Sequence, residues 1–275
     1  MVTIGSILGA TVPACEPGRQ ASARGGCRVA SRAVILAGGR GSRLRPYTTV
    51  LPKPLMPVGD RAILDVVVRQ LRAAGITDVT LAVGHLAHLI RAVFGDGSAC
   101  GVPIRYHEED RALGTAGPLA TIGGLDETFL MMNGDVLTTL DYRALVDSHV
   151  EAGNVLTVAT HRRVVQADYG VLHTDGRVGA TDRVVAYEEK PELPYTVSMG
   201  VYVLEPEAIP YVPPGEPFDL PDLVLALLAA GEPVGSYLFD GYWLDIGRRE
   251  DYERAVADYE RLLPELLPVG EGVLS

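Results

Sequence analysis

A glycine-rich loop beside positively charged side chains is the first part of the sequence that could do chemistry. The stretch AVILAGGRGSRLRP, residues 33–46, changes from an apolar run into a cluster of glycines, a serine and arginines. Glycine lets backbone N–H groups approach an anion closely, and arginine adds a planar, permanently charged fork for phosphoryl oxygens. Lys53 follows between Pro52 and Pro54, whose fixed φ angles stiffen the backbone beneath it. These residue types predict a phosphate-binding site.

Two common phosphate-binding loops do not fit the spacing of these glycines. A P-loop ends in Gly-Lys-Ser/Thr, and no such triplet follows Gly38, Gly39 and Gly41. A G-x-G-x-x-G dinucleotide loop would need glycine where the chain has Leu44, and Pro46 would interrupt the helix that such a loop opens. A nucleotide-dependent oxidoreductase is therefore disfavoured. The pattern favours a loop that wraps a triphosphate with its own amides.

Alternating strand and helix patterns after residue 30 would place this loop at one edge of a sheet. Strands are expected over 32–38, 78–84, 102–109 and 128–135, and helices over 63–75, 87–97, 115–125 and 142–153. Such alternation indicates a parallel sheet with helices on both faces. Ligands of these sheets bind at the carboxyl ends of the strands, where both the glycine loop and the Asn-Gly-Asp of residues 133–135 would lie.

The pattern changes from residue 154 onward. Several strands with turns such as Asp175-Gly176 are expected, followed by a helix over 219–231, a short strand within 235–247 and a helix over about 249–263. We interpret residues 31–265 as a single catalytic domain, residues 1–30 as a disordered extension and residues 266–275 as a tail. No large module is expected after the last helix.

Composition excludes several classes of function. The net charge of −11 disfavours an extended nucleic-acid interface, and no apolar run reaches the roughly 20 residues that a membrane helix needs. The three cysteines, Cys15, Cys27 and Cys100, form neither a metal pattern nor a disulfide framework, which favours a cytoplasmic location. An export signal is disfavoured because no Lys or Arg precedes Arg19. A homo-oligomer is left open.

The sequence resembles the sugar-1-phosphate nucleotidyltransferases over essentially residues 32–263. The resemblance is carried by LAGGRGSRLRPYTTVLPKPLMPVGDRAILD (36–65), LGTAGPL (113–119), FLMMNGDVL (129–137), YGVL (169–172), EEKP (188–191), MGVYVLEP (199–206) and GYWLDIG (241–247). The family makes NDP-sugars from an NTP and a sugar 1-phosphate and releases pyrophosphate. The resemblance implies an α/β fold with a Rossmann-like, mixed but mainly parallel sheet flanked by helices, and a small β-rich sugar-binding part.

The resemblance also implies a role for each motif residue. Arg43 and Lys53 would stabilise the reacting phosphates, and Asp135 and Asp245 would hold Mg²⁺. The nucleotide would be bound by Leu36, Ala37, Gly38, Gly39, Gly41, Ser42, Gly114, Thr115 and Gly134. The sugar phosphate would be bound by Gly170, Glu189, Lys190, Ser198 and Gly200. Thr115 could also cap the helix expected directly after it. No role is assigned to any of the six histidines.

The base and the sugar are harder to predict than the reaction. The LGTAGPL stretch is most similar to the mannose-1-phosphate guanylyltransferase branch. Glucose-1-phosphate thymidylyl transfer is the alternative, although thymidylyl enzymes usually carry a GLAQA stretch there, and uridylyl and cytidylyl transfer also stay open. Ser198 replaces an asparagine that is usual in the family, which implies a different sugar contact or an acceptor, such as a cyclitol phosphate, that is not an ordinary hexose phosphate. A catalytically silent NDP-sugar-binding paralogue is disfavoured because Arg43, Lys53, Asp135 and Asp245 are all present.

Overall fold

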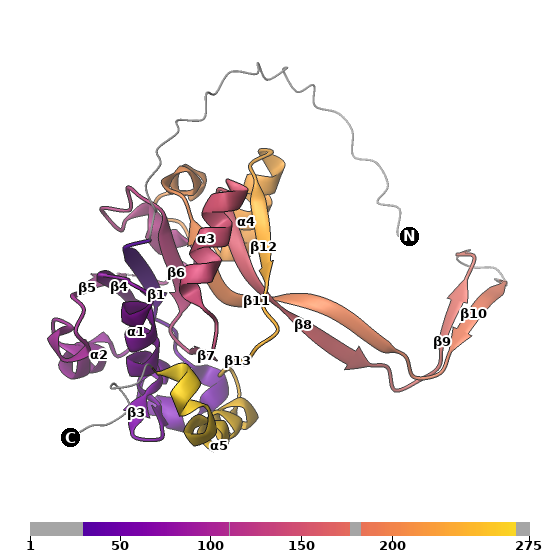
Figure 1. Ribbon diagram of the computed structural model, residues 1–275, viewed down its shortest axis with the longest axis horizontal. Coiled ribbons are helices and arrows are strands. Elements are labelled where there is room, and N and C mark those ends of the chain that lie inside the picture. The colour runs from indigo at the N-terminus through magenta and orange to yellow at the C-terminus, as the bar shows by residue number, and fades with distance from the viewer. Residues whose placement is uncertain (1–29, 110, 177–182, 268–275) are drawn as a thin grey trace, which may run out of the picture.

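A mixed seven-stranded sheet forms the centre of the computed structural model, which describes residues 30–109, 111–176 and 183–267 (Figure 1). The strand order is β12-β8-β11-β6-β1-β4-β5. These strands span Arg32–Leu36 (β1), Asp78–Val83 (β4), Ile104–Glu108 (β5), Phe129–Asn133 (β6), Leu156–Gln166 (β8), Glu192–Leu204 (β11) and Val234–Leu238 (β12). The expected α/β class, with a mainly parallel sheet flanked by helices, is confirmed.

The strands of the first half of the chain pair in parallel. β1 lies between β4 and β6, and β4 pairs with β5 in the same direction. β11 runs antiparallel to β6 and β8, and β12 returns parallel to β8. The carboxyl ends of β1, β4, β5 and β6 therefore meet at one edge of the sheet, as the alternation of elements predicts.

Helices cover both faces of the sheet because successive side chains of a strand point to opposite sides. The α-helices span Ile63–Ala73 (α1), Ala87–Phe94 (α2), Tyr142–Ala152 (α3), Leu220–Ala229 (α4) and Arg249–Leu266 (α5). Ala33 and Ile35 of β1 pack in the core that contains α1, α2 and α3. Val34 points the other way, into the core that contains α4. A third cluster joins α5 to the outer side of α1.

Short elements connect this framework near the glycine loop. They are the two-stranded sheets β2 (Pro57–Val58) with β3 (Arg61–Ala62) and β7 (Val136–Thr138) with β13 (Trp243–Asp245). The 3₁₀ turns are η1 (Ser42–Leu44), η2 (Tyr47–Thr49), η3 (Lys53–Leu55), η4 (Ser98–Cys100), η5 (Gly117–Ala120) and η6 (Pro206–Tyr211). The β7–β13 pair matters most for the site, because it ties the middle of the chain to a segment near its C-terminal end.

A long two-stranded ribbon leaves the body of the molecule (Figure 1). It is formed by the outer parts of β8 and β11, which pair from Leu156↔Leu204 out to Gln166↔Glu192. At its far end lies a separate antiparallel pair, β9 (Val171–Thr174) and β10 (Val184–Glu188). We call residues 161–176 and 183–197 the arm.

Three local expectations differ from the structure. The helix expected over 115–125 is reduced to the 3₁₀ turn η5, because Pro118 and the Gly123-Gly124 pair do not favour a longer helix. The strand expected within 235–247 is two strands in different sheets. β9 and β10 pair from Thr174↔Val184, so their connection is longer than the two-residue Asp175-Gly176 turn. The predicted extension, residues 1–30, and the predicted tail, residues 266–275, lie almost entirely outside the described residues.

Candidate active site

A cavity of about 680 Å³ opens at the carboxyl ends of the parallel strands. β1 contributes Leu36 and the following Ala37, Gly38 and Gly39, and the end of β6 contributes Asn133 and Asp135. Lys53, Gly114 and Thr115 complete the set of predicted residues in its lining. Ligands of open α/β sheets usually bind at this edge, and the volume of the cavity is typical of a small-molecule site.

The glycine loop approaches its neighbours too closely for larger residues. A Cβ atom on Gly38 would lie 3.2 Å from the backbone nitrogen of Gly84. Gly41 has a φ of 57°, and a Cβ there would lie 2.8 Å from the Thr48 side chain, whose hydroxyl donates a hydrogen bond to the Gly41 carbonyl at 2.7 Å. The loop is thereby folded back on a buried threonine, which leaves a compact turn after β1 where backbone amides can face an anion.

Close packing also explains Gly134, between β6 and β7. Its backbone N–H donates to the Leu36 carbonyl at 2.9 Å, and a Cβ would lie 2.9 Å from the same oxygen. The end of β6 therefore presses against the end of β1. This contact brings the segment that carries Asp135 next to the glycine loop.

Lys53 forms ion pairs with two aspartates that are far apart in sequence. Its ammonium nitrogen contacts the Asp135 carboxylate directly and lies 3.8 Å from Asp245 Oδ1. The short turn η3, whose Leu55 N–H bonds to the Pro52 carbonyl at 2.8 Å, holds the lysine from one side. The lysine side chain is only 11 % exposed, so this ion pair is largely shielded from water.

The two aspartates are held together by the β7–β13 ladder. Asp245 pairs in register with Val136, the residue after Asp135, and the Ile246 N–H donates to the Asp135 carbonyl at 3.2 Å. Partial burial raises the pKa of Asp245, and the nearby Asp135 carboxylate raises that pKa further. The positive charges of Lys53 and Arg43 oppose these effects. Two carboxylates thus share one small region with cations around them.

The donor chemistry of this region fits a magnesium ion shared with substrate. Asp135 Oδ1 is buried and has no hydrogen-bond partner, so one carboxylate oxygen is available for a cation. Among the described residues, no group of three or more His, Cys, Asp or Glu side chains could hold a metal ion by itself. Mg²⁺ characteristically binds one or two carboxylates and completes its shell with phosphate oxygens and water. Asp135 and Asp245 match that pattern.

Arg43 lies on the other side of Asp245. Its guanidinium group would lie 3.6 Å from a Cβ built on Gly247, two residues after that aspartate. Arg43 also opposes the rise in the pKa of Asp245, which is consistent with their closeness. The structure therefore brings Arg43, Lys53, Asp135 and Asp245 close together.

Gly114 and Thr115 are fixed by a helix from the second half of the chain. Gly114 has a φ of 79°, and a Cβ on it would lie 2.7 Å from both the Asp219 carboxylate and the Phe218 carbonyl. The Thr115 N–H donates to Asp219 Oδ1 at 2.8 Å, and the Thr115 hydroxyl accepts from the Leu220 N–H at 2.7 Å. Thr115 therefore caps α4, which begins at Leu220, and not the turn that follows it in sequence.

The residues expected to bind the sugar phosphate are divided between two places. Ser198 and Gly200 lie where the arm joins the body, and a Cβ on Gly200 would lie 2.6 Å from the Asn133 side-chain nitrogen, which belongs to a residue of the cavity lining. Gly170, Glu189 and Lys190 lie on the arm, and none of them lines the cavity. The structure thus unites the nucleotide and metal residues but leaves these three apart from them.

Several cavity residues were not predicted from the sequence. They are Arg40, Pro54, Ala82, Gly84, His85, Glu109, Arg111, Ala112 and Asn133. His85 follows β4 and Glu109 follows β5, so both lie at the same sheet edge as the glycine loop. Glu109 accepts a hydrogen bond from the Leu113 N–H at 2.8 Å and so supports the start of the LGTAG segment. The carboxyl-end rule, applied to all four parallel strands, would have found His85 and Glu109.

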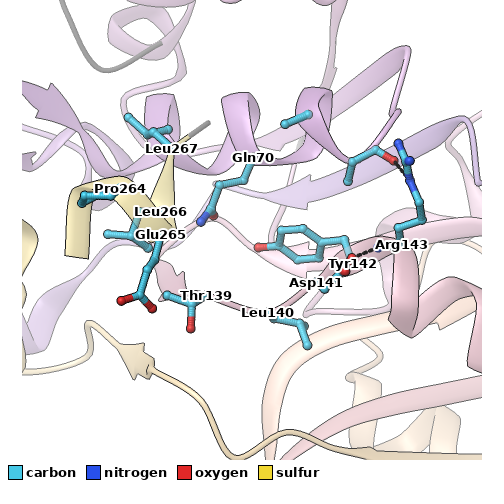
Figure 2. Close-up of a pocket in the computed structure, with 12 residues that line it drawn as sticks. Gln70, Thr139, Leu140, Asp141, Tyr142, Arg143, Pro264, Glu265, Leu266 and Leu267 are labelled. Carbon is cyan, nitrogen blue, oxygen red and sulfur yellow. Dashed lines mark hydrogen bonds between the residues drawn. The ribbon is translucent and has the colours of Figure 1, made fainter. Parts of the chain in front are cut away.

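A second pocket, of about 410 Å³, lies between the end of α1, the start of α3 and the last residues of α5 (Figure 2). Gln70 and Tyr142 line it, and each has one buried polar atom without a hydrogen-bond partner. None of the predicted site residues lines this pocket.

In the described part of the chain, no helix combines the length and apolar character required to cross a bilayer.

Two curated proteins with similar sequences are nucleotidyltransferases by name. The chain is 37% identical over 235 residues to a mannose-1-phosphate guanylyltransferase of Mycobacterium tuberculosis, an alignment that covers 83% of this chain and 64% of the relative. It is 34% identical over 245 residues to a UTP–glucose-1-phosphate uridylyltransferase of Synechocystis, covering 82% of this chain and 62% of the relative. The chain thus spans less than two thirds of the length of these curated relatives.

A solved structure shares the fold. It belongs to a Bacillus anthracis protein assigned as a glucose-1-phosphate thymidylyltransferase, in complex with sucrose. The TM-score is 0.66 at 26% sequence identity, and the match covers 88% of this chain and 98% of that one. Fold and site together define an α/β protein of nucleotidyltransferase architecture. The family model described as Nucleotidyl transferase matches residues 32–261, and the chain belongs to this family, in its sugar-1-phosphate branch.

Proposed function

We propose that this chain transfers a nucleotidyl group from an NTP to a sugar 1-phosphate in a Mg²⁺-dependent reaction. The observation that carries the proposal is the cluster of Lys53 with Asp135 and Asp245 beside the glycine loop. A site with two carboxylates, two fixed cations and exposed amides suits a reaction between two polyanions. Such a reaction needs no protein nucleophile, because an oxygen of the sugar phosphate itself attacks.

The chemistry is an in-line displacement at the α-phosphorus of the NTP. An oxygen of the sugar phosphate forms a bond to that phosphorus, the bond to the β-phosphate oxygen breaks, and pyrophosphate leaves with the electron pair. The attacking oxygen is already anionic, so no general base is required. The protein has to align the two substrates and offset their charge repulsion, which can lower a barrier by several kcal/mol.

Each part of the cluster has a distinct task in this proposal. Amides of the glycine loop would bind the β- and γ-phosphates, and Arg43 would place its guanidinium on the departing pyrophosphate. Lys53, whose ammonium group pairs with both carboxylates, would turn to the α-phosphoryl group as its charge develops. Asp135 and Asp245 would hold Mg²⁺, which supplies charge neutralisation on the phosphate oxygens.

Guanine is the base that we propose. Several relatives with about 30% identity or more are mannose-1-phosphate guanylyltransferases from a bacterium, fungi and a plant. Uracil is the second candidate, because the uridylyltransferase of Synechocystis is similar to nearly the same extent. Glu109 and Arg111, which line the same cavity as Gly114, are charged side chains that could distinguish bases.

A substrate panel tests the proposal. The protein with Mg²⁺ would receive each NTP with mannose, glucose and heptose 1-phosphates and with cyclitol phosphates, and pyrophosphate release would be recorded. We expect the highest kcat/KM with GTP and a mannose-type 1-phosphate. Release with UTP and glucose 1-phosphate alone would replace the base assignment. Absence of pyrophosphate with every pair would contradict the enzymatic function and favour a protein that only binds NDP-sugars.

A further inference from the structure

The strand that carries Asp245 is too short to hold this carboxylate in place by itself. β13 has three residues and, in the described chain, pairs only with the equally short β7. Leu244 in its middle is buried in the cluster that contains α5, so the side chains of Trp243 and Asp245 both point to the opposite face of the strand. An isolated two-stranded pair is marginally stable in water. The position of Asp245 therefore depends on what else holds β13.

Trp243 ties β13 to the central sheet through one hydrogen bond. Its indole N–H donates to the Met199 backbone carbonyl at 3.0 Å. Met199 lies in an irregular part of β11, because the pairing of this strand with β8 shifts register between Ser198 and Tyr202. Backbone groups at such an irregularity lack regular ladder partners, and the indole N–H satisfies one of them. Figure 1 shows β13 beside β7, near the point where β8 and β11 leave the sheet.

The same irregular part of β11 touches the lining of the cavity. Gly200, next to Met199, has a φ of 73°, and a Cβ on it would lie 2.6 Å from the Asn133 side-chain nitrogen. Asn133 ends β6 and lines the cavity two residues before Asp135. A continuous set of contacts thus joins the end of β6 to β11, and β11 to β13.

The ring of Trp243 is held as well as its N–H. The Arg163 guanidinium lies 4.8 Å from the ring centre, and the centre of the His161 ring lies 5.4 Å away. Tryptophan has one N–H donor and no acceptor, so after its bond to Met199 this side chain has no polar group left for a substrate. It is therefore suited to hold Asp245 in place and not to bind a ligand by hydrogen bonds.

We propose that Trp243 is a positioning residue for the metal site and that its bond to Met199 keeps Asp245 within reach of an ion bound by Asp135. The inference rests on the proposed function, in which the two aspartates share Mg²⁺ with the substrate. Mg²⁺ demands near-ideal geometry, with its oxygen ligands at about 2.1 Å, so a small shift of β13 weakens binding at the pair. β7 holds β13 by main-chain bonds, and Trp243 ties it to a second element.

The coupling between Trp243 and the metal has to be reciprocal. If the Trp243–Met199 bond favours Mg²⁺ binding, bound Mg²⁺ favours that bond by the same factor. The indole N–H should then open less often and exchange its proton with water more slowly once NTP and Mg²⁺ are bound. Trp243 is the only tryptophan among the 275 residues, so its indole proton gives a single NMR signal.

Trp243→Phe tests the proposal because it removes the N–H and keeps an aromatic ring. Calorimetry without acceptor gives the dissociation constant of GTP with EDTA and with Mg²⁺, and the ratio of the two isolates the contribution of the metal. We expect Trp243→Phe to lower this ratio by roughly three- to tenfold, the effect of one hydrogen bond. The matched control is Tyr211→Phe, which removes the bond from Tyr211 to Glu232 at 2.8 Å and should leave the ratio unchanged.

Exchange of the indole proton is a second readout and needs no variant that could fail to fold. In wild type with GTP bound, exchange should slow on addition of Mg²⁺ by the factor that Trp243→Phe loses, and Asp245→Asn should abolish this difference. Exchange that does not respond to Mg²⁺ would overturn the positioning role. So would a Trp243→Phe variant with the wild-type ratio, or one whose only defect is a higher KM for the sugar 1-phosphate.

Failure of the proposed function has a different signature. A wild type whose affinity for GTP and UTP is the same with EDTA and with Mg²⁺ would contradict the metal site itself and the positioning role with it. A wild type that binds NTP more tightly with Mg²⁺, while Trp243→Phe keeps the same ratio, would overturn the positioning role alone.

Discussion

The ammonium group of Lys53 forms an ion pair with the carboxylate of Asp135, which lies 82 residues further along the chain. In the absence of substrate, the lysine thus partly offsets the negative charge of the site. A substrate phosphate would compete with the carboxylates for Lys53 while a divalent ion would compete with Lys53 for the carboxylates. On the proposed function, metal binding would therefore release the lysine toward the substrate.

Removing the charge of Lys53 should abolish most activity. We expect Lys53→Met to lower kcat by about 10²-fold or more, the usual effect of losing one group that stabilises transition-state charge. Lys53→Arg should rescue little, because a planar guanidinium does not replace a compact ammonium between two carboxylates. Steady-state pyrophosphate release measures both effects. The control is Arg254→Met, which removes an exposed cation on α5 and should leave kcat unchanged.

Asp135→Asn should impair metal use without unfolding the chain. The amide keeps the shape of the side chain but loses the negative charge that Mg²⁺ requires. Turnover should fall by orders of magnitude, the Mg²⁺ concentration for half-maximal rate should rise, and EDTA should abolish the wild-type rate. Asp147→Asn, an exposed substitution on α3, is the matched control. Near-normal turnover of Asp135→Asn at low Mg²⁺ would exclude this aspartate as a metal ligand.

Asp245→Asn should stabilise the chain at neutral pH while it inactivates the site. Burial and the adjacent Asp135 carboxylate raise the pKa of Asp245 above its ordinary value of 3.8. The folded chain therefore binds this proton more tightly than the unfolded chain, and the contribution to stability is present below about pH 3.8 and is lost as pH rises through the folded-state pKa.

Melting temperatures at several pH values test whether the charged form of Asp245 destabilises the folded chain. Asparagine removes the charged form, so the variant should melt above wild type at pH 7, and the difference should vanish toward pH 3.5 or so. The gain should stay below about 1 kcal/mol, because solvent screens a side chain that is 47 % exposed. A variant that melts below wild type at pH 7 would show that the carboxylate stabilises the fold.

Gly114→Ala should weaken nucleotide binding through the backbone. The positive φ of Gly114 and the closeness of the Asp219 carboxylate leave no space for a methyl group. We expect a loss of about 1–3 kcal/mol of stability and a higher KM for the NTP, because the segment that carries Thr115 would shift. Gly123→Ala is the matched control, since a Cβ there meets nothing within 4 Å. Equal KM values for the two variants would argue against a role of this segment.

The sequence was sufficient for the parallel strands of the sheet and for the edge at which the glycine loop and Asp135 lie. Buried parallel strands are continuous apolar runs, so β1, β4 and β6 could be recognised, and the carboxyl-end rule then placed the glycine loop beside Asp135. Short elements carry little periodic signal, so the three-residue strand β7 and its register with β13 were out of reach. The same holds for Thr115, whose hydroxyl finds the Leu220 N–H 105 residues away.

The arm shows a different limit of sequence reasoning. Alternation of apolar and polar residues indicated strands after residue 154, and β8 and β11 are indeed strands. Where a ribbon points, however, depends on a few contacts at its base, such as those of Trp243 with Met199 and Arg163. These contacts join segments from both ends of the second half of the chain, and no local pattern encodes them.

The β7–β13 ladder determines at which stage of synthesis the two aspartates of the candidate site can come together. Asp245 is made long after Asp135 and reaches it only through a three-residue strand that pairs with Val136–Thr138. A nascent chain on the ribosome can therefore complete the sheet strands around the glycine loop while the reacting centre still lacks one carboxylate. On the proposed function, a chain at this stage would lack one metal ligand and would not turn over a nucleotide until nearly all of the matched region has emerged.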